Sequence, residues 1–472
     1  MSNILTLLEQ NPNHAEIFRK AGKLGDHLGY QVYLVGGYVR DLFLGRQNMD
    51  IDLMVEGDGI SFARQFAKTL GVHNIVLYEK FKTAFIPYDE VKIEVATSRT
   101  ENYQPDSRKP DVQEATVKED MSRRDFTVNA VAVSLSQAAY GDITDPFFGI
   151  QDMNKRILRT PLAPDETFSD DPLRMMRAAR FSAQLEFDIE PEVFNAIIRQ
   201  KDRLSIISRE RITEEIIKTL KTDTPSRGLM AMKRGGLLQF AFPELDVMSG
   251  VDIIHGKGHK DVFLHTLKVV DNSAKLTSKM KIRLAALVHD IAKPATKRFD
   301  KSKGWTFHGH DEIGKRMLVG IAQRMKLSKD LRDYLMKMTK LHLRPIALAK
   351  KEITDSAIRR VMFEAGDDLD DLMILCRADI TTKNPGKVKQ YIANFDRVES
   401  LMQDVLLRDE MKAFQSPVRG DEIMRVLNLT PGPIIGKIKS AIEEAILDGK
   451  IENTYEAAFQ YMMENREKIK LK

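Results

Sequence analysis

The pattern of apolar and polar positions changes near residue 150. Residues 15–29 have apolar positions at helical spacing, and the apolar run QVYLV then predicts a strand that leads into a turn at Gly36 and Gly37. VRDLFLG predicts a short helix that ends at Gly45. The runs MDIDLMV, NIVLYEKF, TAFIPY, VKIEVAT and FTVNAVAVSL predict further strands. The first 150 residues or so therefore predict a small mixed sheet flanked by helices.

From Asp170 to the end of the chain, nearly every segment has helical spacing, interrupted by Pro and Gly. The predicted fold class is therefore α+β. Shifts in composition near residues 150, 250 and 395 predict four parts: 1–150, 151–250, 251–395 and 396–472. Seven of the ten histidines lie between His255 and His342, so we expect the third part to have a different task from the rest.

The composition of the 472 residues says more about the compartment of the protein than about its function. No apolar run is long enough to span a bilayer, and the first residues lack the basic-then-apolar pattern of a secretory signal. A single cysteine, Cys376, excludes an internal disulfide and fits a reducing compartment, so we expect a cytoplasmic protein. The net charge of +5 permits a polyanionic partner without requiring one.

Two carboxylates follow the glycine pair at a spacing that brings them together. Residues i and i+2 of a strand point to the same face, so Asp50 and Asp52 share one side of MDIDLMV. Two ionised carboxylates so close are unfavourable unless divalent cations bridge them, and oxygen ligands suit magnesium. The glycine turn ahead of a helix would bring backbone N–H groups close to substrate phosphates. The alternative is a solvated strand end, and the same two interpretations apply to Glu94 in VKIEVAT, a candidate third carboxylate.

Arginine is combined with aspartate in the motif MSRRDFTVNA. Arg123, Arg124 and Asp125 come just before an apolar run. Arginine suits triphosphate oxygens, and an aspartate accepts hydrogen bonds from ribose hydroxyls. The alternative interpretation of this motif is a surface salt bridge.

A second combination of arginine and aspartate lies in FSDDPLRMMRAARF. It predicts a helix that Asp170 and Asp171 open, with Pro172 in the first turn. Three arginines at three-residue spacing share one stripe of this helix: Arg174, Arg177 and Arg180. Such a stripe indicates an anionic or polar partner, whereas the two acids alone are also explained as helix caps.

These motifs together resemble a known family. The chain resembles class II CCA-adding tRNA nucleotidyltransferases and bacterial poly(A) polymerases in their signature motifs, which appear here in order as GGYVRDLFLG with DID, RRDFTVNA, DPFFG and DDPLRMMRAARF. The segment RERITEEI at 209–216 continues the match. HTLKVV, LAALVHDIAKPATKRF, WTFHGHDEIG and LHLRPIAL resemble the HD domain of many bacterial CCA-adding enzymes. The ending PGPIIGKIKSAIEEAILDGKI resembles the C-terminal helices of those enzymes. The resemblance covers essentially the whole chain. It implies a nucleotidyltransferase head, an all-α neck with the base-selecting and primer-binding segments, an HD domain and tRNA-binding C-terminal helices, in the four parts given above.

The resemblance implies roles for the residues of the first two parts. Asp50 and Asp52 would hold catalytic Mg²⁺ ions. The other nucleotide-binding candidates are Gly36, Gly37 and Arg40 at the triphosphate, Arg123 and Arg124 at phosphate, Asp125 at the ribose 2′-hydroxyl, and Arg177 and Arg180 on the arginine stripe. In the family a Glu-Asp-x-x-Arg sequence selects the incoming base. Here Asp171 and Arg174 match it, while Asp170 replaces the glutamate. The implied substrates are CTP and ATP, and the implied partner is the acceptor arm of tRNA.

The third part carries six candidate metal ligands in the order of the HD family: His265, His289, Asp290, His310, His342 and Asp379. Imidazole with carboxylate favours a transition metal such as Ni²⁺ or Mn²⁺, or a mixed binuclear site. Such a site would activate water for phosphoester hydrolysis. Lys293 resembles a phosphate-binding lysine of HD hydrolases. His308 is a candidate for the ligand shell, and His255 and His259 are candidates for its approach.

Several functions are compatible with these motifs. The leading interpretation is addition of C, C and A to tRNA. An A-adding enzyme or a poly(A) polymerase shares every N-terminal motif, but the mixed charge of the C-terminal part favours CCA addition. The polar segment 96–112 also favours CCA addition, because it lies where the family has a flexible loop. The alternative interpretation of this segment is an ordinary exposed connection. A regulatory HD phosphohydrolase with a degenerate head would not need intact RRDFTVNA and DDPLR motifs. A non-catalytic tRNA-binding protein would not need Asp50 and Asp52. No long heptad pattern specifies an oligomeric state.

Overall fold

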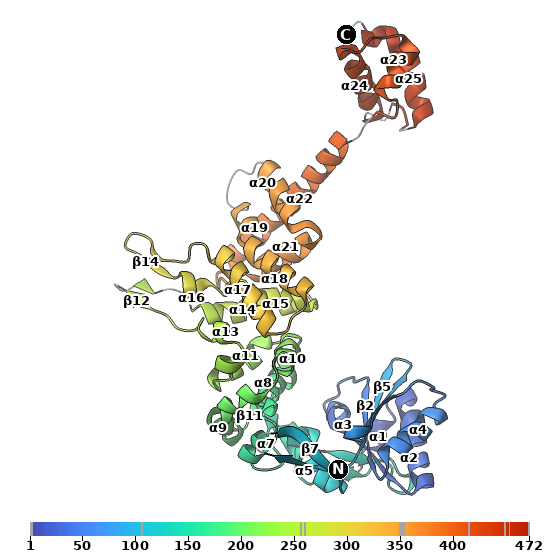
Figure 1. Ribbon diagram of the computed structural model, residues 1–472, viewed down its shortest axis with the longest axis vertical. Helices are drawn as coiled ribbons and strands as arrows, with labels where there is room; N and C mark the ends of the chain where they lie inside the picture. The colour runs from blue at the N-terminus through green and yellow to red at the C-terminus, as the bar shows by residue number, and fades with distance from the viewer. Residues whose placement is uncertain are drawn as a thin grey trace. The chain divides into compact units, whose positions relative to one another are not determined.

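The computed structural model describes residues 3–104, 107–254, 257–258, 261–348, 355–413, 416–447, 450–452 and 454–470. The chain divides into two compact units. The first contains Met1–Leu343 and Asp370–Lys383, and the second contains Arg344–Leu369 and Asn384–Lys472. Figure 1 labels the elements along the chain. The four-part division expected from the sequence stays a prediction.

The first unit begins with a mixed seven-stranded sheet in the order β3-β4-β5-β2-β1-β8-β9, so the predicted α+β fold class is confirmed. Strands β2 and β5 are parallel, and the other neighbouring pairs are antiparallel. The strands are β1 Gln31–Val35, β2 Asp50–Glu56, β3 Val76–Tyr78, β4 Thr83–Tyr88, β5 Val91–Thr97, β8 Ala132–Ser134 and β9 Ile143–Thr144. The helices of this region are α1 Leu5–Leu8, α2 Pro12–Leu28, α3 Gly36–Phe43, α4 Gly59–Thr69, α5 Val117–Ser122 and α6 Gly149–Lys155. Short 3₁₀ helices are η1 Glu79–Phe81, η2 Thr127–Asn129 and η3 Gln137–Ala139.

The sequence predicted that Gly36 and Gly37 form a turn before helix α3, but the structure has no separate turn there. The helix begins at Gly36 itself, directly after β1, and Gly36 has a φ of 71°. A residue with a side chain is strained at this φ. A Cβ atom on Gly36 would also lie 2.7 Å from the Asp52 Oδ2 atom. The first glycine is therefore required both by the backbone and by the carboxylate beside it.

The polar segment 96–112, predicted as a loop or an exposed connection, forms most of a β-hairpin instead. Strands β6 Arg99–Gln104 and β7 Ser107–Glu114 pair antiparallel, with Arg99 opposite Glu114. Residues 105 and 106 between the strands lie outside the described residues. A hairpin ladder is made by backbone groups and needs no apolar alternation, so the polar composition concealed it.

Helices dominate the chain after the sheet, as the sequence predicted. They are α7 Pro164–Asp170, α8 Leu173–Leu185, α9 Pro191–Gln200, α10 Arg209–Leu220, α11 Pro225–Arg234, α12 Leu238–Ala241 and α13 Pro243–Asp246, with the 3₁₀ helix η4 Lys201–Ile206. Strands β10 Ile157–Leu158 and β11 Asp188–Ile189 form a short parallel pair.

The prediction that Asp170 and Asp171 together open the arginine-bearing helix is wrong for Asp170, while the Asp171 side chain accepts from the N–H of Leu173, the first residue of that helix. Asp170 is the last residue of α7, and Asp171 is extended, with φ −138° and ψ 100°. Helix α8 begins only at Leu173. The cause is Pro172, because the residue before a proline is driven out of the helical region.

The remaining helices of the first unit surround the histidines. They are α14 Val262–Leu276, α15 Met280–Val288, α16 Lys293–Thr296, α17 His310–Arg324, α18 Lys329–Leu341 and α21 Leu369–Ala378. Two short hairpins are formed by β12 Ile253–Ile254 with β13 Lys257–Gly258, and by β14 Arg298–Asp300 with β15 Gly304–Thr306. His255 and His259 lie outside the described residues.

The second unit is helical where it is described. Its elements are α20 Asp355–Ala365, η5 Gly366–Asp368, α22 Pro385–Ala413, α23 Gly420–Leu427, α24 Pro433–Leu447 and α25 Tyr455–Lys470, and α19 Leu343–Leu348 leads into it from the first unit. Helices α23, α24 and α25 share an apolar core that includes Ile423, Ile438 and Met462. Among the described residues, no helix has the length and apolar character that a membrane span requires.

Candidate active site and metal centre

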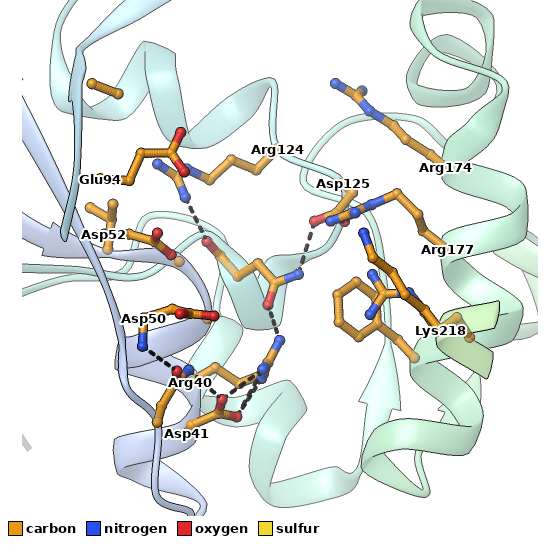
Figure 2. A pocket seen from close by; sticks show the side chains of 18 of the residues that line it. Arg40, Asp41, Asp50, Asp52, Glu94, Arg124, Asp125, Arg174, Arg177 and Lys218 are labelled. Atoms are coloured by element: carbon orange, nitrogen blue, oxygen red, sulfur yellow. Dashed lines mark hydrogen bonds and ion pairs between the residues drawn. The ribbon is translucent and has the colours of Figure 1, made fainter. Parts of the chain in front are cut away.

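Strand pairing places a third carboxylate beside the predicted pair. In the parallel ladder of β2 and β5, Asp52 lies opposite Glu94 and Asp50 lies opposite Lys92. Ile51, between the two aspartates, faces the opposite side and is fully buried. Asp50, Asp52 and Glu94 all line a cavity of about 1000 Å³ and lie together on one wall of it (Figure 2). The predicted third carboxylate is therefore in place.

The environment of Asp52 raises the pKa of its carboxyl group above the ordinary value. Burial and the neighbouring Glu94 raise the pKa of Asp52 to about 6, although Arg124 and the backbone N–H of Gly37 act to lower it. Carboxylates gathered this way repel one another in their ionised form. A divalent cation with oxygen preference relieves that repulsion, so the donor set fits Mg²⁺.

The two arginines of the RRD motif are held by an acid that the sequence analysis missed. Arg123 and Arg124 both donate to the carboxylate of Asp120, which is 1% exposed. Asp120 precedes them by three and four residues, the spacing at which helical side chains meet, so this pairing was detectable in the sequence. Burial works to raise the pKa of Asp120, but the two arginines lower it below its usual value. Asp120 thus presents both guanidinium groups at the cavity.

Arg40 belongs to a buried network that reaches across the head. It donates to both carboxylate oxygens of Asp41 and, at 2.8 Å, to Oδ1 of Asn129. Asn129 in turn donates its Nδ2 group to Oδ1 of Asp125 at 2.9 Å. Figure 2 shows this path from Asp41 to Asp125. Arg40 lines the cavity, but Asp41 and Asn129 fix its guanidinium, which is the arrangement of a positioning residue.

Asp125 links the sheet region to the helices that follow it. Its Oδ2 atom accepts from Nε of Arg177 and lies 2.7 Å from Nη2 of the same side chain, and its Oδ1 atom accepts from the Phe126 N–H and from Asn129. These contacts outweigh the effect of burial and lower the pKa of Asp125 to about 2. A carboxylate offers about four lone-pair positions, and three hydrogen bonds occupy those of Asp125 here.

The arginine stripe of α8 is anchored from α10 by a residue that the sequence analysis did not single out. Glu215 is 2% exposed and accepts from Arg180 Nε at 2.7 Å, and it lies 3.9 Å from Nη1 of Arg177. Lys218, also on α10, lines the same cavity and faces it together with Arg174 and Arg177 (Figure 2). The cavity thus has a basic wall from α8 and α10 opposite the carboxylates of the sheet.

The predicted base-selecting pair lies on that basic wall. Asp171 accepts from the Leu173 N–H and, at 2.8 Å, from Arg211 of α10. Arg174 donates to the backbone carbonyls of Thr167 and Arg123, so its guanidinium is fixed by the neck and by the RRD motif. Both residues line the cavity. Asp170 is not among the residues that line it.

The six predicted ligands of the third part come together and are here called the histidine centre: His265, His289, Asp290, His310, His342 and Asp379. They fall into two groups of potential ligand atoms, each within 4.8 Å. His265, His289 and Asp379 form one group, and Asp290, His310 and His342 form the other. Asp290 joins the two groups.

Asp290 faces one group with each of its carboxylate oxygens. Its Oδ2 atom lies 3.4 Å from Nε2 of His265 and 3.2 Å from Nε2 of His289. Its Oδ1 atom lies 3.4 Å from Nε2 of His310 and 3.7 Å from Nε2 of His342. Burial works to raise the pKa of Asp290, but its neighbours, His289 first, lower it well below the usual range. Asp290 would therefore hold metal together with the rings of both groups.

The ring orientation of the histidines leaves Nε2 for a metal. The Nδ1 atoms of His289, His310 and His342 lie 2.7–2.8 Å from backbone carbonyls three residues earlier, so Nδ1 carries the proton if Nε2 is to bind metal. Among the described residues, Nε2 of His289 and of His310 and Oδ1 of Asp290 are buried without a hydrogen-bond partner. Burial and His289 lower the pKa of His342 to about 4, which keeps its imidazole neutral. Buried polar atoms without partners are costly, so the donor set fits a bound metal.

Lys293 lies beside this centre and donates to Oδ2 of Asp290. His308 is exposed and is not in either group of potential ligands, so its predicted place in the shell is not found among the described residues.

Family models match three stretches of the chain. The Poly A polymerase head domain matches residues 32–159, the probable RNA and SrmB-binding site of polymerase A matches residues 186–248, and the HD domain matches residues 262–384. The fold and the site thus define a nucleotidyltransferase head joined to an RNA-binding segment and an HD domain.

Curated relatives resolve the class further. A multifunctional CCA protein of Pseudoalteromonas atlantica is 30% identical over 84% of this chain and 96% of its own length. An A-adding tRNA nucleotidyltransferase of Deinococcus radiodurans is 29% identical over 90% of this chain and 93% of its own. Another A-adding tRNA nucleotidyltransferase, of Geobacter sulfurreducens, is 36% identical, but the match spans only 48% of this chain and 26% of that protein. The chain belongs to the family of tRNA nucleotidyltransferases.

Solved structures of CCA-adding enzymes share the fold. An apo form has a TM-score of 0.62 at 23% identity and covers 98% of this chain and 99% of its own. A Thermotoga maritima CCA-adding enzyme complexed with tRNA has a TM-score of 0.58 at 22% identity and covers 98% of each chain.

Proposed function

We propose that the chain adds C, C and A to the 3′ end of tRNA from CTP and ATP without a nucleic-acid template. The observation that carries this proposal is the cavity, which has three carboxylates on the sheet and Arg174 opposite them (Figure 2). Asp171 lines the same cavity. Relatives named as CCA proteins and solved structures of CCA-adding enzymes with ATP, CTP and tRNA support it. The reducing compartment expected from the single cysteine fits a cytoplasmic site of action.

Different residues of the cavity would bind the metal ions and the triphosphate. Asp50 and Asp52, with Glu94 beside them, would hold Mg²⁺. When bound, paired Mg²⁺ ions lower the pKa of an attacking 3′-hydroxyl and stabilise the leaving pyrophosphate. Arg123 and Arg124 would bind the triphosphate, because planar guanidinium groups suit phosphate oxygens. No protein nucleophile is required in this reaction.

Base selection follows from hydrogen-bond complementarity. Cytosine and adenine each present an amine donor next to an unprotonated ring nitrogen. Asp171 would accept from the amine, and Arg174 would donate to the ring nitrogen. Guanine and uracil present a carbonyl and a protonated nitrogen there, and each mismatched buried group costs about 1–3 kcal/mol. One site would therefore take both CTP and ATP and reject GTP and UTP.

An A-adding enzyme is the alternative, because two of the relatives described above are named as A-adding tRNA nucleotidyltransferases. The same carboxylates and arginines would serve that reaction. The two functions differ in whether CTP is a substrate on tRNA that lacks its whole terminus.

The test offers tRNA that lacks all three terminal nucleotides, and tRNA that already ends in CC, with Mg²⁺ and labelled CTP or ATP separately and together. Products that gain two C residues and then one A support CCA addition. Incorporation of a single A on the CC-ended substrate alone would establish the alternative. Long A tracts on either substrate would instead make the chain a poly(A) polymerase.

We further propose that the histidine centre is a metal-dependent phosphohydrolase that acts on damaged RNA 3′ ends. Two observations support it: Asp290 lies between the two groups of histidines, and the Nε2 atoms of His289 and His310 are buried without a hydrogen-bond partner among the described residues. A transition metal such as Ni²⁺ or Mn²⁺ would activate water there. Lys293 would bind the phosphate. Hydrolysis of RNA that ends in a cyclic phosphate, with and without Ni²⁺ or Mn²⁺, tests this activity; absence of metal-stimulated product would refute it.

A further inference from the structure

Three of the four histidines in the histidine centre are oriented by their own helical turn, and the fourth is not. His289, His310 and His342 direct Nδ1 to carbonyls three residues earlier. His265 instead directs Nδ1 to the side-chain Oγ1 atom of Thr381, at 3.1 Å. Thr381 is 116 residues away in the sequence. The orientation of His265 therefore depends on tertiary structure.

Thr381 comes from the same short segment as the ligand Asp379. The Oδ1 atom of Asp379 lies 3.0 Å from Nε2 of His265, so Asp379 and Thr381 contact the two opposite nitrogens of one ring. Residues 378–381, which begin at the last residue of helix α21, are here called the 378–381 segment. It brings both a ligand and the group that orients another ligand.

The backbone of the 378–381 segment is fastened to helix α14 by Asn272. Its Nδ2 group donates to the carbonyl of Ala378 at 2.8 Å and to that of Ile380 at 3.2 Å. Asn272 follows His265 by seven residues, so both lie on one face of α14. Carbonyls 378 and 380 point to Asn272 while side chains 379 and 381 point to His265. The two hydrogen bonds from Asn272 thus hold the 378–381 segment in the conformation in which Asp379 and Thr381 reach the His265 ring.

The two groups of the histidine centre consequently differ in how they are built. In the group of Asp290, His310 and His342, both rings are held by adjacent backbone. In the group of His265, His289 and Asp379, one ligand and one orienting hydroxyl arrive together on a segment that is fixed by side-chain contacts. Two residues after Thr381, the first unit ends at Lys383.

We propose that Thr381 is a positioning residue that sets the metal affinity of the group formed by His265, His289 and Asp379. Its hydroxyl oxygen accepts a hydrogen bond from the Nδ1–H group of His265, which fixes the tautomer and leaves the Nε2 lone pair for a divalent transition-metal ion. The other group binds its ion independently of Thr381. The histidine centre therefore fills in two unequal steps, and a change at residue 381 moves only one of them. This inference rests on the proposed metal centre and does not depend on nucleotidyl transfer.

The test measures metal binding by the full chain rather than its activity. Millimolar Mg²⁺ is present throughout to occupy the oxygen-rich carboxylates of the head, which prefer that ion to softer metals. Co²⁺ is then titrated, with visible absorption as the readout of ring coordination and bound metal counted after equilibrium dialysis. We expect two Co²⁺ ions per chain in the unmodified protein.

Three substitutions separate orientation from packing. Thr381→Val keeps the shape and removes the hydroxyl, and loss of an outer-shell partner typically weakens metal binding about 10- to 100-fold. We expect that loss in one step only, with the absorption band of that step altered. Thr381→Ser restores the hydroxyl and should restore both. Thr266→Val is the matched control, because Thr266 is buried beside His265 and its hydroxyl has no partner among the described residues.

The outcomes are distinct. Two unaltered binding steps in Thr381→Val, failure of Thr381→Ser to recover, or equal weakening by Thr266→Val would overturn the role of Thr381. If the unmodified chain binds no Co²⁺ at the histidine centre, the proposed metal centre itself fails. Nucleotide incorporation, measured on the same preparations, reports that each variant is folded.

Discussion

Asp50 and Asp52 lie two residues apart on one strand, whereas the ligands of the histidine centre are collected from His265 to Asp379. The strand places its carboxylates on the wall of a wide cavity, where Asp50 is exposed. The histidine centre is more buried, since His289 and Asp290 are each 1% exposed. The side chains of His265 and Asp379 keep 15% and 18% of their surface exposed. The first arrangement leaves room for phosphates around a hard cation, and the second draws more of its candidate ligands from the protein. The two proposed metal sites thus differ in donor type and in access.

The largest expected effect comes from Asp52→Asn. Loss of a cation ligand that stabilises transition-state charge by several kcal/mol should lower nucleotide incorporation by about 10³-fold. Hydrolysis at the histidine centre should continue, because that centre has its own ligands. Single-turnover incorporation of labelled ATP measures the first effect. Glu90→Gln, on the exposed turn between β4 and β5, is the control and should incorporate normally; simultaneous loss of both activities in folded Asp52→Asn would contradict two separate sites.

Asp290→Asn tests the other half of the comparison. Since Asp290 faces both groups of ligands, its charge should be required for both metal ions, and we expect at least about 100-fold weaker binding in each step. Metal counted after dialysis against Ni²⁺ or Mn²⁺ measures this loss. Incorporation should keep its unmodified rate. Retention of one tightly bound ion would show that Asp290 does not bridge the groups.

Asp171→Asn tests whether the basic wall selects the incoming base. An amide in place of the carboxylate weakens acceptance from the amine of adenine or cytosine, so preference over GTP and UTP should fall roughly 10- to 100-fold. The ratio of kcat/KM values for the four nucleotides measures the change. Asp170→Asn makes the same chemical change one residue earlier, outside the cavity lining, and should preserve discrimination. Equal effects from both variants would argue against selection by Asp171.

The smallest effect concerns pH. Burial and Glu94 raise the pKa of Asp52 to about 6, so protonation should weaken Mg²⁺ binding as the pH falls through 6. Glu94→Gln removes one cause of the raised pKa. The acid limb of the rate, measured at subsaturating Mg²⁺, should therefore move to lower pH, by less than about one unit. A shift in the opposite direction would show that Glu94 does not act on Asp52 through its charge.

The same distinction between the two sites separates what the sequence determined from what it did not. Strand periodicity alone placed Asp50 and Asp52 on one face, because alternation is a local property of an extended backbone. The order of histidines and acids indicated the histidine centre. Local rules failed at Asp170, where the proline two residues later ended one helix before another began, and at the hairpin of β6 and β7, which backbone pairing alone defines.

Only the tertiary structure decided which groups meet across the chain. The parallel register of β2 and β5 set Glu94 beside Asp52, and packing of α10 against α8 brought Arg211 to Asp171 and Glu215 to Arg180. The contact of Thr381 with His265 is of the same kind. Each of these pairs joins residues distant in sequence, and no local periodicity encodes such a distance. Their positions follow from how the apolar faces of strands and helices pack, which is a property of the folded chain as a whole.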